Sequence, residues 1–199
     1  GYWSPEKLTE DVDISWKLQL AGWEIRFEPR ALCWILMPET LGGLWKQRLR
    51  WSMGGTQVLL DYWPQLFSLK NLRLWPLCIE YSMSILWACL FSLLAVYRGI
   101  DLIFFKVDLQ SVPILMLGWA GLLIGTTCMV QIMLSLVLDR PYDRGLLKNY
   151  FWMIWYPIIY WVITAATSVT ALPKILLRDT EKRALWTSPD RGIKPDASR

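Results

Sequence analysis

Hydrophobic and polar positions divide the chain into two parts near residue 73. Before that point charged and apolar residues are interspersed, and after it long uncharged stretches are separated by short charged loops. Three of these stretches, residues 74–97, 112–138 and 149–172, each exceed the roughly 20 residues that a helix needs to cross a bilayer. The first carries one ionisable residue, Glu80, and the other two carry none. The pattern predicts about three transmembrane helices.

Residues 1–38 show a mixed α/β pattern. Thr9 fits a helix N-cap, and apolar residues then recur at helical spacing until Gly22, which is a natural stop. Apolar and charged residues alternate over residues 23–27, and residues 31–37 form an apolar run of strand length. We therefore expect one helix and two short strands. These are too few to bury an independent core, so the segment is predicted to belong to a larger domain.

Residues 39–73 predict a second helix, from Thr40 to about Tyr62. It mixes lysine and arginine with leucine and tryptophan, which is typical of a helix at the level of the lipid headgroups. A basic tail, residues 173–199, follows the last apolar stretch. Three crossings would place this tail opposite the first part of the chain, against the positive-inside rule. Either one stretch is re-entrant, or the tail departs from the rule.

The composition supports a membrane protein and excludes several function classes. Hydrophobic residues make up 54% of the chain and charged residues 19%, with 14 tryptophans. The net charge of +4 comes from basic residues that flank the apolar stretches, where they suit lipid headgroups rather than nucleic acid. The sequence has no histidine, which excludes a Ser-His-Asp triad and histidine-ligated zinc. Its four cysteines form no C-x-x-C pair, so they predict neither a metal site nor a disulfide framework.

An acidic motif, Thr9-Glu10-Asp11, begins the first predicted helix. Taken alone, it is explained by a capped helix whose first-turn carboxylates interact favourably with the positive end of the helix dipole. The alternative is that one of these carboxylates acts as a general base. The motif alone does not decide between the two.

A second motif, Gln47, Arg50 and Trp51, has the spacing Q-x-x-R-W on the interfacial helix. Residues at i, i+3 and i+4 share one helix face, so the three side chains can approach the same ligand. A guanidinium binds phosphate oxygens through paired donors, and an indole offers a flat apolar plate to a sugar ring. The trio therefore suits a sugar diphosphate. Its structural alternative is a basic aromatic anchor in the membrane interface.

In this order, and before a membrane bundle, the two motifs resemble those of the processive, inverting family 2 glycosyltransferases, which include the cellulose, chitin and hyaluronan synthases. Four segments are very similar to the branch that makes poly-β-1,6-N-acetylglucosamine in bacterial biofilms: Thr9–Gln19, Glu28–Trp34, Leu44–Trp51 and Trp186–Gly192. The resemblance implies an α/β plus membrane α-helical fold. Residues 1–38 would be the C-terminal part of a Rossmann-like GT-A catalytic domain, residues 39–73 an interfacial segment, and residues 74–172 the transmembrane bundle.

The resemblance also implies a reaction. The donor would be UDP-N-acetylglucosamine, and the acceptor the 6-hydroxyl of the growing β-linked polysaccharide. Asp11 would be the base, and Glu10 would orient its neighbour or the helix. Arg50 and Gln47 would bind the departing diphosphate, and Trp51 would stack beneath the acceptor sugar. The family also uses Mg²⁺, held by D-x-D-type carboxylates that this chain does not supply. We therefore expect the chain to be a C-terminal half that is inactive by itself and holds no metal site.

Expected partners and location follow from the same resemblance. They are a multi-pass position in the bacterial inner membrane, contact with membrane lipid, passage of the polymer between the spans, a small membrane subunit and activation by cyclic di-GMP. No nucleic-acid partner is expected. Two alternatives remain open. The chain could belong to a hyaluronan, chitin or cellulose synthase, or to a non-catalytic membrane subunit that retains the motifs.

Overall fold

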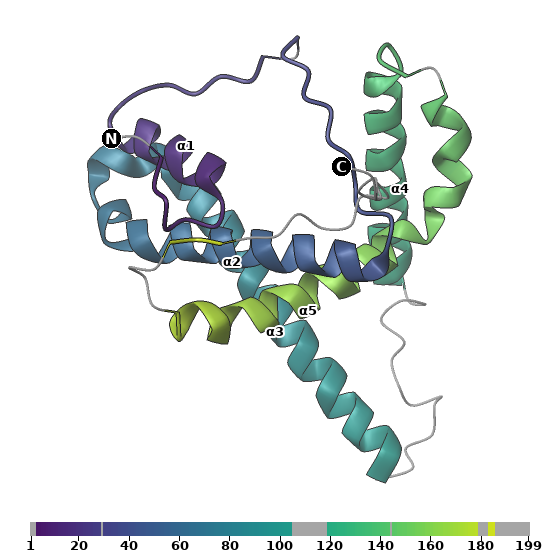
Figure 1. Cartoon of the computed structure of the whole chain (residues 1–199). Coiled ribbons are helices and arrows are strands. Elements are labelled where there is room, and N and C mark those ends of the chain that lie inside the picture. Colours follow the sequence, from purple (N-terminus) through teal and green to yellow (C-terminus); the bar gives the residue numbers. More distant parts are fainter. Residues whose placement is uncertain (1–2, 29, 105–118, 144, 179–182, 186–199) are drawn as a thin grey trace, which may run out of the picture. The chain divides into compact units, whose positions relative to one another are not determined.

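In the computed structural model, residues 3–28, 30–104, 119–143, 145–178 and 183–185 are described (Figure 1). The chain forms two compact units. The first consists of Gly1–Ser92 together with Ile163–Arg199, and the second of Leu93–Val162. Both predicted motifs lie in the first unit. Each unit is therefore described by itself.

The N-terminal part of the first unit contains two described helices and a short 3-10 helix. Helix α1 spans Glu10–Leu20, helix α2 spans Leu41–Leu66, and η1 spans Leu69–Leu74. The α1 helix packs against α2 (Figure 1) through a small apolar core. The buried core residues are Trp16, Val58, Leu59, Leu66, Leu74 and Cys78. This core holds α1, which begins with the acidic motif, against α2, which carries Q-x-x-R-W.

Among the described residues, three helices are long and apolar enough to cross a membrane. Helix α3 spans Trp75–Phe104, α4 spans Trp119–Asp139, and α5 spans Tyr156–Leu176. Most of their large apolar side chains are exposed, as expected when lipid covers them. In the second unit, α4 packs against the 3-10 segment η3, Leu146–Ile154.

Small residues let α2 approach its neighbours in the first unit. A Cβ atom at Gly55 would lie 2.6 Å from Cζ of Tyr81 on α3, so only glycine fits this contact. The hydroxyl of Tyr81 donates to the carbonyl of Ser52 at 3.4 Å. The Ser52 hydroxyl in turn lies 3.4 Å from that of Thr167, a fully buried residue of α5. The part of α5 from Ile163 onward is thereby tied to α2.

The predicted helices are confirmed, with small changes at their ends. The first begins at Glu10 after Thr9, and the second begins at Leu41, where the hydroxyl of Thr40 accepts a hydrogen bond from Gly43 N at 3.0 Å. The third apolar stretch is interrupted, because η3 ends at Ile154 and the long helix starts only at Tyr156. Of the second stretch, residues 112–118 lie outside the described residues, as does the motif Trp186–Gly192.

The two predicted strands are wrong for the described part of the chain. Residues 23–28 and 30–39 are extended or irregular, and no strand is formed among the described residues. Their apolar side chains are exposed, including Phe27 and Trp34. A strand needs a neighbouring strand to pair its backbone N–H and C=O groups, and no described residue offers one. The Rossmann-like part of the fold prediction is therefore not observed.

Candidate functional site

The loop that leads into the acidic motif is held by side chains of α2. Nη1 of Arg50 donates to the carbonyl oxygen of Leu8 at 3.1 Å. Seven residues, or about two turns, further along α2, Gln57 accepts from Leu8 N at 3.4 Å and donates to the Glu6 carbonyl at 3.3 Å. Residues 50 and 57 lie on one face of the helix. The Q-x-x-R-W helix thus binds the backbone directly before Thr9.

An ion pair extends the same face of α2. The Lys7 ammonium contacts the carboxylate of Asp61, eleven residues after Arg50. From the C-terminal side of the first unit, Arg178 donates to the Glu6 carbonyl at 3.1 Å, and the backbone N–H of Ala184 donates to Pro5 O at 2.8 Å. Residues distant in the sequence therefore fix the short loop that precedes the motif.

Thr9 packs closely on Gly54 of α2. A Cβ atom at Gly54 would lie 2.8 Å from the Thr9 Cβ, so any larger residue would displace Thr9. The predicted N-cap position of Thr9 is confirmed, although its side chain makes no cap hydrogen bond. Its Oγ1 is buried and has no partner among the described residues. Thr9 stands at the N-cap position, but its side chain is turned against α2 instead of toward the helix N–H groups.

Glu10 and Asp11 follow Thr9 and are both exposed. Oδ1 of Asp11 accepts from the N–H of Val12 at 2.9 Å, and the Ser15 hydroxyl donates to the Asp11 carbonyl at 2.7 Å. The Asp11 carboxylate therefore has a fixed position at the start of α1, open to solvent. An exposed, oriented carboxylate can reach a substrate hydroxyl.

Asp13, two residues later, is fully buried and structural. Its Oδ2 accepts from the Ser4 hydroxyl at 2.8 Å and from Lys17 Nζ at 3.0 Å, and its Oδ1 accepts from the Tyr62 hydroxyl at 2.8 Å. Burial alone would raise the pKa of Asp13, but the bonds from Lys17, Tyr62 and Ser4 outweigh it and hold the pKa below its ordinary value. Burial and the bond to Asp13 raise the pKa of Tyr62. This cluster locks α1 to α2.

Replacing Tyr62 by phenylalanine is expected to destabilise this junction by about 1–3 kcal/mol, because it leaves one oxygen of a buried carboxylate without a donor. The measurement is a thermal shift of the detergent-solubilised full-length protein. Tyr97→Phe, which alters an exposed tyrosine of α3, is the matched control. Equal melting temperatures for Tyr62→Phe and wild type would show that the bond stabilises nothing.

The lowered pKa of Asp13 makes the stability of the folded protein depend on pH. Because its folded pKa lies below the unfolded value of 3.8, its contribution is present above that value and is lost as the pH falls through the folded pKa. Asp13→Asn is expected to lower the melting temperature at neutral pH and to flatten its decline below about pH 4. Melting curves from pH 7 to 3 measure this. A decline as steep as that of wild type would contradict the assignment.

The three residues of Q-x-x-R-W have different surroundings. Gln47 is 5% exposed, and its Oε1 has no partner among the described residues. Trp51 is 38% exposed, and the Arg48 guanidinium lies 4.5 Å from the centroid of its ring. Arg48 is expected from its helical position to face away from the trio, toward lipid headgroups, but it covers one face of the indole that is predicted to bind sugar. A sugar ring would stack on the other face, or would displace Arg48.

The structure joins the two motifs at one point. Arg50 reaches the backbone next to Thr9, but no described contact links Gln47 or Trp51 to Glu10 or Asp11. Two contributors were missed from the sequence, Gln57 and Gly54. Glycine within a helix is unfavourable and signals a close contact, so Gly54 could have been found. Gln57 carries no such signal.

The amino-acid sequence of the chain is similar to those of known proteins. Residues 1–172 match the family described as "Glycosyl transferase family group 2". The chain belongs to this family. No solved structure matches it.

Relatives give a narrower similarity. The chain is 40% identical over 198 residues to a protein of Staphylococcus epidermidis named poly-beta-1,6-N-acetyl-D-glucosamine synthase. This alignment covers 96% of the chain and 47% of the relative. A protein of Staphylococcus aureus with the same name is 38% identical over 195 residues, with the same coverage. The chain thus spans about half the length of the curated relatives it matches. The family resemblance predicted from the two motifs is confirmed.

Proposed function

We propose that this chain is part of a processive, inverting glycosyltransferase that polymerises N-acetylglucosamine from UDP-N-acetylglucosamine into a β-1,6-linked biofilm exopolysaccharide. The observation that carries the proposal is the hydrogen bond from Arg50 to the carbonyl of Leu8. It joins the helix suited to bind a sugar diphosphate to the segment that presents a solvent-open carboxylate. The names of the 40% and 38% identical relatives support the choice of polymer.

In this proposal Asp11 is the general base. It accepts the proton of the acceptor's 6-hydroxyl as that oxygen forms its bond to the anomeric carbon of the donor. The bond from the anomeric carbon to the diphosphate oxygen breaks in the same step, and its electron pair leaves with UDP. One displacement converts the α-linked donor into a β-linked product, so no covalent intermediate is needed. Glu10, the adjacent exposed carboxylate, orients its neighbour or the helix.

The Q-x-x-R-W residues bind the departing diphosphate and the acceptor sugar. A guanidinium carries five donors in a fork, so Arg50 can hold the Leu8 carbonyl and still donate to a diphosphate oxygen. The buried Oε1 of Gln47 is an acceptor suited to a sugar hydroxyl, and its amide N–H groups can donate to the diphosphate. Trp51 stacks beneath the terminal sugar and keeps its hydroxyl within reach of Asp11.

Mg²⁺ is expected in this family, but the described residues do not fit it. They contain no group of three or more Cys, Asp or Glu side chains that could hold a metal ion. Asp13 is buried and bonded to Ser4, Lys17 and Tyr62. No step is therefore derived through the metal. We propose that its ligands lie in the part of the relatives' length that this chain does not span.

We also propose the location and partners of the complete enzyme. The apolar helices suit a multi-pass protein of the bacterial inner membrane, and their spans would form the path of the polymer. A small membrane subunit and cyclic di-GMP activation are proposed from the resemblance alone. The contact between Arg178 and the Glu6 carbonyl favours a tail that starts on the same side of the membrane as Asp11, which requires one of the three apolar stretches to be re-entrant.

Isothermal titration of the full-length protein with UDP tests this function. A synthase should bind UDP in the presence of Mg²⁺, and chelation of the metal should remove the binding. A non-catalytic subunit that retains the motifs should bind no UDP under either condition. Incorporation of labelled N-acetylglucosamine or glucuronic acid into polymer then separates the proposed enzyme from a hyaluronan synthase.

Trp51→Ala is expected to shorten the polymer more than it weakens donor binding, because it removes the plate under the acceptor rather than a group on the diphosphate. The measurements are product length by gel electrophoresis and the Kd for UDP by titration. Trp63→Ala, on an exposed tryptophan of the same helix, is the control. Unchanged product length in the Trp51 variant would rule out the stacking role.

A further inference from the structure

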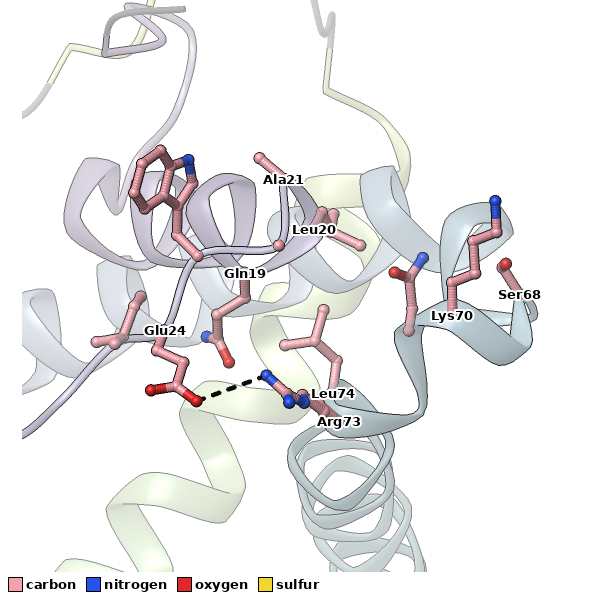
Figure 2. Close-up of a pocket in the computed structure, with 12 residues that line it drawn as sticks. Gln19, Leu20, Ala21, Glu24, Ser68, Lys70, Arg73 and Leu74 are labelled. Atoms are coloured by element: carbon pink, nitrogen blue, oxygen red, sulfur yellow. Dashed lines mark ion pairs between the residues drawn. The ribbon is translucent and has the colours of Figure 1, made fainter.

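A cavity in the first unit is lined by residues outside the two motifs. It has a volume of about 840 Å³ and includes none of the residues assigned to catalysis or substrate binding. Its walls come from the end of α1, the extended residues after it and the η1 turn (Figure 2). The polar lining residues are Gln19, Glu24, Ser68, Lys70, Asn71 and Arg73.

The charge of this cavity is positive. Lys70 has no hydrogen bond or ion pair with any described residue. Arg73 lies 3.8 Å from Glu24, a pair drawn as a dashed line in Figure 2, but both side chains are more than half exposed, so water screens the pair. Glu24 is also shared with Arg26, at 3.0 Å. Two cations against one shared carboxylate leave a site that favours an anion.

The position of η1 indicates which anion. This turn begins the apolar segment Leu69–Asp101 that is long enough to span the membrane. Residues three apart share a side of a 3-10 turn. Leu69 and Leu72 are exposed and lie outside the cavity, whereas Lys70 and Arg73 line it. One side of the turn thus suits lipid chains, and the other presents positive charge at the depth of the headgroups.

The rim of the cavity continues this amphipathic pattern. Trp23 is 68% exposed and Ile25 is 48% exposed, and both line the cavity. Exposed tryptophan beside a span is typical of the membrane interface. A small soluble anion would leave these apolar groups in water, whereas an amphiphile would cover them.

We propose that this cavity binds the phosphate headgroup of an anionic membrane phospholipid. Lys70 and Arg73 contact the phosphodiester, and the hydroxyl of Ser68 and the amide of Gln19 are placed to donate to its oxygens. Trp23 packs against the glycerol region. The bound lipid would hold η1, and with it the end of α2, at a fixed depth in the membrane.

Native mass spectrometry of the full-length protein, with phosphatidylglycerol or phosphatidylcholine added in detergent, tests the proposal. Lys70→Gln/Arg73→Gln should lower the affinity for phosphatidylglycerol roughly ten-fold or more and leave that for phosphatidylcholine unchanged. The control is Lys46→Gln/Lys174→Gln, which removes the same charge from two exposed positions outside the cavity. Its affinity for phosphatidylglycerol should change much less.

Three results would overturn the proposal. Equal losses in the two double variants would mean diffuse attraction to charge, and equal affinity for both lipids would mean no recognition of the headgroup charge. Displacement of phosphatidylglycerol by millimolar inorganic phosphate would assign the cavity to a soluble anion. If the double variant does not fold by thermal shift, Lys70→Gln alone replaces it, because Lys70 has no described partner whose loss would destabilise the protein. Binding of UDP is unaffected by either double variant, which separates this test from that of the proposed enzyme.

Discussion

Asp11→Asn in the full-length enzyme is expected to abolish polymer synthesis. The change removes one charge from an exposed side chain, so the amide can keep its bond with the Val12 N–H and α1 keeps its position. An amide does not accept a proton from a hydroxyl at neutral pH, and loss of a general base costs about 10²–10⁴-fold in rate. Incorporation of labelled N-acetylglucosamine into polymer measures the loss.

Matched variants separate loss of the base from general damage. Asp139→Asn neutralises another exposed aspartate, at the end of α4, and should retain full activity. Asp13→Asn affects the buried cluster and should lower stability, whereas Asp11→Asn should leave the melting temperature and membrane insertion unchanged. Normal synthesis by the Asp11 variant would remove this residue from the mechanism, whatever the other variants do.

Helices of this chain could be predicted because their signals are local. The N-cap Thr40, the apolar periodicity of α1 and the uncharged stretches after residue 73 each act within a few turns of one segment. The expected strands failed for the opposite reason. An extended segment becomes a strand only when another strand pairs with it, and that partner is not encoded in residues 23–39.

The contacts around the candidate site could be predicted from the sequence only in part. The stacking of Arg48 on Trp51 follows i, i+3 spacing and could have been foreseen. Burial of Asp13 could not, because three acidic residues in a first turn are usually exposed, and its donor Tyr62 lies 49 residues away. The contact of Arg50 with the Leu8 carbonyl is equally non-local. Tertiary packing therefore decided which of several similar carboxylates stays in solvent.

Gly54→Ala is expected to disable the enzyme although the residue touches no substrate. The new methyl group would lie 2.8 Å from the Thr9 Cβ, so the backbone that carries Asp11 must move away from α2. Overpacking of this kind costs about 1–3 kcal/mol of stability. Displacement of a catalytic group by about 1 Å can lower the rate about 10²-fold, so activity should fall far more than stability does.

Gly42→Ala provides the matched control on the same helix. A Cβ atom at Gly42 meets nothing within 4 Å, so alanine should be tolerated and should stabilise α2 by up to about 1 kcal/mol. If both variants keep wild-type synthesis, the close contact of Thr9 with α2 does not position the acidic motif. If Gly54→Ala loses activity while its UDP affinity stays normal, the defect lies in the placement of Asp11 rather than in donor binding. That result would support a mechanism in which α2 serves the reaction twice, through the side chains it presents and through the glycine that lets α1 approach.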